Sequence, residues 1–281
     1  MEQQTITKQD IAAFVHHLRQ EERSPGTIDN YLRDVSVFAH WLGNRPATRE
    51  HSAAWKDHLL SRGYAPATIN AMLAALNVFF RFLGWNHCLV KFLKIQRRLF
   101  RDTRQELTHA EYDRLIETAN TLGRARLALL METICATGIR VSEVKYITVE
   151  AVQRGRAEIF LKGKIRTILL PGKLRRKLLQ FARNNKTVSG EIFLTRNGCG
   201  LSRKQIWAEM KSLCERAGVA PSKVFPHNLR HLFARTFYKV CRDVAKLADI
   251  LGHTSIETTR IYLISTGIEH ARVMERLRLI Q

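Results

Sequence analysis

The sequence has few cysteines, no apolar leader and no long hydrophobic run. Five cysteines occur in 281 residues and none forms a CxxC pair, so reduced thiols are the simplest interpretation. The opening residues MEQQTITKQD are polar, which argues against a signal peptide. The apolar stretch 71–80 is interrupted by Asn77 and closed by Arg81, too short to cross a membrane. These absences favour a cytoplasmic protein without a membrane partner.

Acidic residues are scarce beside basic ones. The chain has 25 Asp and Glu against 46 Lys and Arg, a formal net charge of +21, and most of the excess falls after residue 100. A chain so basic is expected to meet a polyanion such as a nucleic acid. A basic surface that is merely solvated is the alternative that composition leaves open. The length allows one or two domains, each with its own core.

Apolar periodicity predicts a small four-helix domain in the first 90 or so residues. Glycines follow three of the helices as stop signals, and Thr7 and Asp10 have the spacing of a capping box. PGTIDNYLRDVSVFAHWLG and PATINAMLAALNVFFRFLG match in register. They represent either an internal duplication or two buried helices with a similar start, stop and apolar stripe. The predicted helices are 7–20, 27–42, 52–61 and 68–83.

A basic stretch follows this domain and predicts a linker over residues 93–106, between a first domain at 1–92 and a second at 107–281. Such a stretch is either a tether that runs along a phosphate backbone or a solvated connector. The cations of the whole basic stretch, residues 91–106, are Lys91, Lys94, Arg97, Arg98, Arg101 and Arg104.

The second domain is predicted to be mainly helical with a small sheet. Helical periodicity restarts at 107–120 and continues in the apolar run 124–137, and a new helix is expected near Val141. The β-rich runs AEIFL and IRTILLP flank Lys-Gly-Lys, a pattern typical of a hairpin. Residues from about 173 to 281 favour helix. The predicted fold class is mainly α with a small β-sheet.

Four short motifs carry the chemistry. They are ATGIRVSE at 136–143, LKGK at 161–164, HNLRH at 227–231 and LGHTSIETTRIY at 251–262. Two guanidinium groups can clamp one phosphate through paired hydrogen bonds. A phenol, with a pKa of about 10, can attack that phosphate when nearby positive charge and a histidine activate it. The combination predicts cutting and rejoining of a nucleic-acid backbone through a covalent intermediate, without a metal or cofactor.

Each of these residues also has an ordinary structural interpretation. Arg140 alone suits a surface charge, Lys162 a hairpin tip, and Tyr262 a half-buried aromatic. His227 and His231 are spaced like a metal pair on a helix. No Glu follows His227, however, and an arginine stands between the two histidines, which argues against a metal site.

Taken in order, the motifs resemble the tyrosine recombinase (phage-integrase-type) family over essentially the whole chain. In that family, two arginines clamp the phosphate, one histidine is a candidate base for the tyrosine and another bonds a phosphate oxygen, while a lysine protonates the leaving 5′ oxygen. Because the hairpin turn is shorter than the family's commoner form, either Lys162 or Lys164 is the lysine. Glu143 and His231 are expected to support the site or to be plain structural residues. The implied catalytic residues are Arg140, Lys162, His227, Arg230, His253 and Tyr262.

The resemblance implies an N-terminal core-binding (SAM-like) domain and an α+β catalytic domain that bind duplex DNA with specific core sites. Lys164 and the linker cations are expected to contact this DNA. The implied protein is a compact Xer-like or transposon-borne recombinase, bacterial and nucleoid-associated. It would act through a 3′-phosphotyrosyl intermediate in integration, excision or resolution. The alternatives are a catalytically silent DNA-binding protein and a type IB topoisomerase-like enzyme.

The stretch after Tyr262 has an apolar helical stripe. Such a helix packs either on a neighbouring subunit, which would support the tetramer that the resemblance implies, or on its own domain. The stripe comprises Ile264, Ile268, Ala271, Met274 and Leu277.

Overall fold

A computed structural model describes residues 4–95, 103–161, 164–253, 255–260, 262 and 275–277. The chain divides into two compact units, residues 1–97 (unit 1) and 98–281 (unit 2). The division falls inside the predicted linker, and the boundaries at 92 and 107 stay predictions. Within the described part, no helix is both long and apolar enough to span a bilayer.

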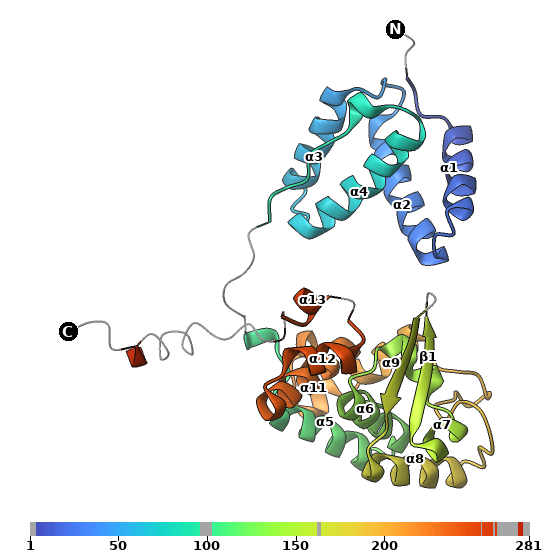
Figure 1. Cartoon of the computed structure of the whole chain (residues 1–281), viewed down its shortest axis with the longest axis vertical. Helices are drawn as coiled ribbons and strands as arrows, with labels where there is room; N and C mark the ends of the chain where they lie inside the picture. The colour runs from blue at the N-terminus through green and yellow to red at the C-terminus, as the bar shows by residue number, and fades with distance from the viewer. Residues whose placement is uncertain are drawn as a thin grey trace. The chain divides into compact units, whose positions relative to one another are not determined.

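Unit 1 is a bundle of helices, as predicted (Figure 1). Asp10 N–H donates to Thr7 Oγ1 at 3.1 Å and Thr7 N–H to Asp10 Oδ2 at 2.8 Å, so the predicted capping box is confirmed. Helices α2 and α4 begin earlier than predicted because proline occupies their first position, where a missing N–H costs nothing. The helices are α1 (Lys8–Gln20), α2 (Pro25–Leu42), α3 (Arg49–Ser61) and α4 (Pro66–Phe82), followed by the 3-10 turn η1 (Asn86–Cys88).

Two asparagines of α4 hold the segment that leaves unit 1. Asn77 accepts from Val90 N–H and donates to Val90 C=O, both at 2.9 Å. Asn70 makes the same pair of bonds with Leu93, at 2.8 and 2.9 Å. Each amide satisfies both polar groups of one residue, as a neighbouring strand would. The basic stretch therefore begins on a segment that is fixed to α4.

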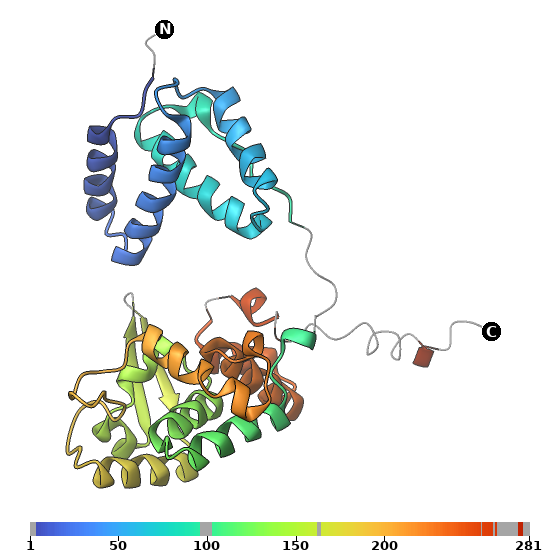
Figure 2. The same cartoon turned by 180° about the vertical axis from the view of Figure 1, so that it is seen from behind.

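Unit 2 packs helices around one central helix, α6, with a two-stranded sheet at one side (Figures 1 and 2). The predicted hairpin is confirmed as antiparallel, with Leu161 opposite Lys164. The mainly α fold with a small sheet is therefore confirmed. The strands are β1 (Arg156–Leu161) and β2 (Lys164–Leu169). The helices are α5 (His109–Thr121), α6 (Ala125–Thr137), α7 (Val149–Arg154), α8 (Gly172–Asn184), α9 (Arg203–Lys211), α10 (Cys214–Ala217), α11 (Pro226–Cys241), α12 (Val244–Leu251) and α13 (Ile256–Arg260). The 3-10 turns are η2 (Thr103–Gln105), η3 (Val141–Tyr146) and η4 (Pro221–Lys223).

The helix expected near Val141 begins there but is the 3-10 segment η3 rather than an α-helix. Glu143 N–H bonds to Arg140 C=O at 2.8 Å, three residues back, and the Glu143 carboxylate accepts from Arg140 N–H at 2.7 Å. The backbone bond spans three residues, which is the spacing of a 3-10 helix, and such helices are common as short connectors. Arg140 is the N-cap residue of this turn.

Gly138 is required where α6 ends. Its φ is +65°, and a Cβ there would lie 2.4 Å from the Phe233 ring. Both conditions select glycine, because other residues carry a Cβ and avoid the left-handed region. Because this turn lies close to α11, Arg140 lies near Arg230 of that helix.

Candidate active site

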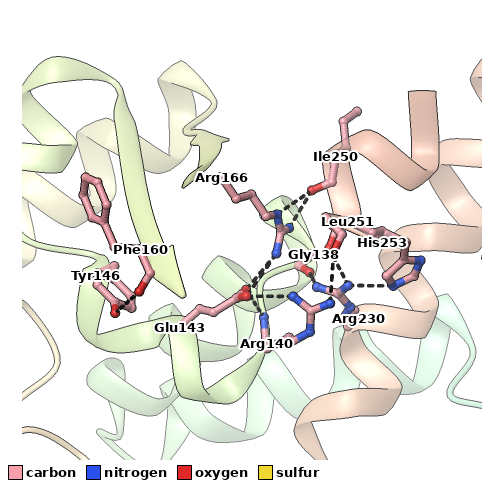
Figure 3. Close-up of polar contacts among 11 residues, drawn as sticks. Gly138, Arg140, Glu143, Tyr146, Phe160, Arg166, Arg230, Ile250, Leu251 and His253 are labelled. Atoms are coloured by element: carbon pink, nitrogen blue, oxygen red, sulfur yellow. Dashed lines mark hydrogen bonds and ion pairs between the residues drawn. The ribbon is translucent and has the colours of Figure 1, made fainter. Parts of the chain in front are cut away.

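The site is organised around the C-terminal end of α12. Three consecutive backbone carbonyls at this end each accept from a different arginine (Figure 3). The last carbonyls of a helix have no intrahelical donors and carry its negative partial charge, so they attract cations. The bonds are Arg166 Nη2 to Ile250 O at 2.5 Å, Arg230 Nη2 to Leu251 O at 2.7 Å, and Arg140 Nη2 to Gly252 O at 3.3 Å.

Arg230 is the most deeply buried of these arginines. It projects from α11, is 1% exposed, and donates to Gly138 O as well as to Leu251 O. Its Nε has no hydrogen-bond partner among the described residues. Burial, followed by the charge of Arg140, lowers its pKa. A buried cation with an unused donor is a strong place for an anion to bind.

Glu143 supplies the negative charge of this cluster. It is 1% exposed and accepts from Arg140 Nη1 at 2.8 Å and from Arg166 Nη1 at 3.0 Å. It therefore orients both arginines from one carboxylate. With Arg230 nearby, the described cluster has three guanidinium groups and one carboxylate, which leaves it positive.

His253 is held as a neutral ring. Its Nε2 lies 3.0 Å from Arg230 Nη2 and its Nδ1 lies 2.8 Å from Thr259 Oγ1. Because a guanidinium N–H only donates, Nε2 accepts and the ring proton sits on Nδ1. Burial, followed by the charges of Arg230 and Arg140, lowers the pKa of His253 to about 4.

Tyr262 is 5% exposed and lies among aromatic rings and the arginine cluster. Its ring centroid is 4.7 Å from that of His231 and 5.8 Å from that of His253. It stacks on His253, whose Nε2 accepts from Arg230, so the phenol lies next to that guanidinium, and Tyr262 raises the pKa of Arg230. The ring of His227 contacts His231 at 4.6 Å, and burial and the arginines lower the pKa of His227.

The structure therefore brings together five of the six residues predicted to be catalytic. Arg140, His227, Arg230, His253 and Tyr262 come from η3, α11 and the segment after α12. The sixth, Lys162, lies outside the described residues. Its alternative, Lys164, is the first residue of β2, and its side chain is likewise outside the described part.

The residues predicted to bind DNA are spread along the chain. Lys91 and Lys94 are exposed in unit 1, and Arg104 is exposed in unit 2. Arg97, Arg98 and Arg101 lie outside the described residues, as does most of the predicted tail stripe. Leu277, the stripe's last member, is 56% exposed.

Arg166 belongs to this arginine cluster, although no motif indicates it. It lies opposite Ile159 in the hairpin, on the face that carries the buried Ile168. Period-2 alternation in IRTILL puts this arginine among inward-facing positions, which was the available signal. Burial lowers its pKa to about 10, against the opposing effect of Glu143.

Comparisons with known proteins agree with this arrangement. Residues 105–267 match the model of the phage integrase family, and residues 11–87 match the phage integrase N-terminal SAM-like domain. A SAM-like bundle followed by a mainly helical unit with this site defines a protein of the tyrosine recombinase class. The chain belongs to the phage integrase family, and the family recognised from the motifs is confirmed.

Two curated relatives show the degree of similarity. Tyrosine recombinase XerC of Roseiflexus castenholzii is 32% identical over 176 residues, which cover 58% of this chain and 55% of the relative. Tyrosine recombinase XerA of Pyrococcus furiosus is 30% identical over 184 residues, 63% of each chain. The chain thus spans between about half and two thirds of the length of the curated relatives it matches.

Solved structures share the fold. A lambda integrase dimer bound to a COC′ core site has a TM-score of 0.74 at 18% identity, covering 91% of this chain and 94% of that one. A lambda integrase tetramer bound to a Holliday junction has a TM-score of 0.74 at 19% identity, covering 92% and 77%.

Proposed function

We propose that the protein is a site-specific DNA recombinase that cuts and rejoins duplex DNA through a covalent 3′-phosphotyrosyl intermediate. The observation that carries this proposal is Arg230, a buried guanidinium with an unused Nε–H and no anion among its described partners. Tyr262 lies beside it. A phosphodiester would supply the missing anion and present its phosphorus to the phenol.

The arginines would stabilise the charge that gathers on the phosphate during displacement. Arg140, with 40% of its side chain exposed, can reach an incoming phosphate from the solvent side, while Arg230 binds from within. Both are oriented beforehand, Arg140 by Glu143 and Arg230 by carbonyls. Preorganised donors of this kind lower the barrier without reorganisation at the moment of reaction. The positive charge serves the role that a metal ion has elsewhere.

The chemical step follows from these positions. The Tyr262 oxygen forms a bond to phosphorus while the bond from phosphorus to the 5′ oxygen breaks. The phenolic proton passes to a base, for which His227 is the candidate, because its low pKa keeps it neutral near pH 7. A lysine of the hairpin, Lys162 or Lys164, gives a proton to the leaving 5′ oxygen. The phosphotyrosine conserves the bond energy, so the reverse attack rejoins the strand.

His253 changes its role when a phosphate binds. Without one, its Nε2 accepts from Arg230. A phosphate beside Arg230 offsets the positive charges that lower the pKa of His253. Nε2 can then carry a proton and donate it to a phosphate oxygen, while Thr259 keeps the ring in place.

We also propose that the active assembly is a tetramer on two DNA sites. The lambda integrase structures include a dimer on a core site and a tetramer on a Holliday junction. The apolar stripe after Tyr262 suits a contact between subunits. Phosphate contacts from the exposed Lys91, Lys94 and Arg104 would add affinity that depends on salt.

The test uses a duplex selected for binding from a random-sequence library and nicked next to the scissile phosphate, so that the cleaved end diffuses away. The wild type should form a detergent-resistant protein–DNA adduct. Tyr262→Phe should bind the duplex and form no adduct. An adduct that survives this change would refute the nucleophile. Relaxation of any supercoiled plasmid without a selected site would indicate a topoisomerase instead.

A further inference from the structure

Arg166 occupies a position that no predicted role explains. Its side chain is 12% exposed, and all three of its nitrogens are used. Nε and Nη2 donate to Ile250 O at 3.2 and 2.5 Å, and Nη1 donates to both oxygens of Glu143 at 3.1 and 3.0 Å (Figure 3). One side chain thereby connects β2, η3 and the end of α12.

We propose that Arg166 is a positioning residue. It holds the hairpin, and hence the hairpin's lysine, in a fixed position relative to the phosphate clamp, which consists of Arg140 and Arg230. The inference deepens the proposed function and rests on it. Arg166 follows Lys164, the first residue of β2, by two residues, and it follows Lys162 by four residues in the sequence. A shift of this strand against α12 therefore moves the lysine relative to Arg140 and Arg230.

Few described contacts hold the hairpin toward its tip, among them the bond that the Tyr146 hydroxyl donates to Phe160 C=O at 3.2 Å, which joins β1 to η3. Its base is anchored by Ala157 and Ile168, which are buried in the core of unit 2. Its outer face is bare, since Phe160 and Ile165 are 60% and 69% exposed. A two-stranded hairpin is only marginally stable by itself. Among the described side chains, Arg166 is the last one on the inward face of β2 before the tip.

Gly252 shows that α12 is shaped for this contact. A Cβ at Gly252 would lie 2.3 Å from Cδ of Arg166, and the φ of Gly252 is +62°. The arginine stem therefore fills the space that any other residue would occupy. The same glycine offers its carbonyl to Arg140 at 3.3 Å. Gly252 therefore contacts both Arg166 of β2 and Arg140.

The inference separates two effects of removing Arg166. If Arg166 acts by placing the hairpin lysine, its loss impairs proton delivery to the leaving 5′ oxygen. If it acts only by bracing Glu143 and Arg140, its loss weakens stabilisation of the phosphate. A sulfur atom in place of the bridging 5′ oxygen distinguishes the two, because a thiolate leaves without being protonated.

The experiment compares adduct formation on two nicked duplexes that differ only at this bridging atom. Arg166→Met should slow cleavage of the oxygen duplex on the order of 100-fold, as expected for a misplaced catalytic group. It should cleave the sulfur duplex within a few-fold of the wild-type rate, as Lys162→Ala or Lys164→Ala does for the lysine that donates. Arg166→Lys, which keeps the charge but lacks the fork, should show the same rescue in a milder form.

Arg175→Met is the matched control. Arg175 also donates to two backbone carbonyls, of Val152 and Gln153 at 2.9 and 2.7 Å, but it does so on α8. This variant should cleave both duplexes like the wild type. If Arg166→Lys slowed adduct formation equally on both duplexes, or on neither, the inference about Arg166 would be wrong while the proposed function would stand. No adduct from the wild type on either duplex would overturn the proposed function with it.

Discussion

Glu143→Gln tests how the arginine cluster is held together. The substitution keeps the shape and one carbonyl oxygen but removes the negative charge. Arg166, which is 12% exposed, then keeps its bonds to Ile250 O but loses its ionic partner. The charge of Arg140 is destabilised less by the loss of Glu143, because 40% of the Arg140 side chain is exposed to water.

The expected loss of stability follows from the burial of Arg166. Breaking a buried ion pair by removing one partner costs about 3–5 kcal/mol, because the remaining charge stays buried. Since glutamine still offers one acceptor, we expect the lower end, about 3 kcal/mol off the free energy of unfolding of unit 2. For a domain of this size, about 3 kcal/mol lowers Tm by roughly 6–12 °C.

The measurement must separate unit 2 from unit 1. Hydrogen exchange on peptides from α6 and α11 reports the free energy of unfolding of unit 2 alone. Arg166→Met is the partner in a double-mutant cycle with Glu143→Gln. Because the double variant leaves no unpaired buried charge at this pair, its cost should fall below the sum of the single costs by about 1–3 kcal/mol. Additive costs, or a loss below about 1 kcal/mol for Glu143→Gln, would refute the ionic account of the cluster.

Three further predictions follow. Gly138→Ala should destabilise unit 2 by about 1–3 kcal/mol in denaturant unfolding, because of its φ of +65° and the clash with Phe233; a neutral effect would contradict the required close approach. The pKa of His253 is about 4 in the folded chain against about 6.5 when unfolded, so stability that is complete above pH 6.5 is lost as the pH falls toward 4. His253→Gln should reduce the change in the free energy of unfolding between pH 6.5 and 4. An unchanged pH dependence would refute the assignment of this effect to His253. Replacing Lys91 and Lys94 by glutamine should reduce the salt slope of DNA binding by about 2 if both contact phosphates; an unchanged slope would show that neither does.

Local patterns accounted for most of the helices. Caps such as Thr7 with Asp10, and stops such as Gly43 and Gly138, act within one turn of the chain, so their effect is visible in a short window of sequence. The six-residue turn η3 differed because its form depends on the Glu143 carboxylate bonding back to Arg140. Such a bond is decided by side-chain placement rather than by periodicity.

The order and composition of the motifs were enough to recognise the family and to predict which residues would bind a phosphate, because these features do not depend on where the motifs lie in space. How these residues meet depends on the folded chain. It brings Arg140, Arg166 and Arg230 to three consecutive carbonyls at the end of α12, and it makes His253 an acceptor. The physical reason is that burial and the partners of a charged side chain depend on segments far apart in the chain, which a local pattern does not record.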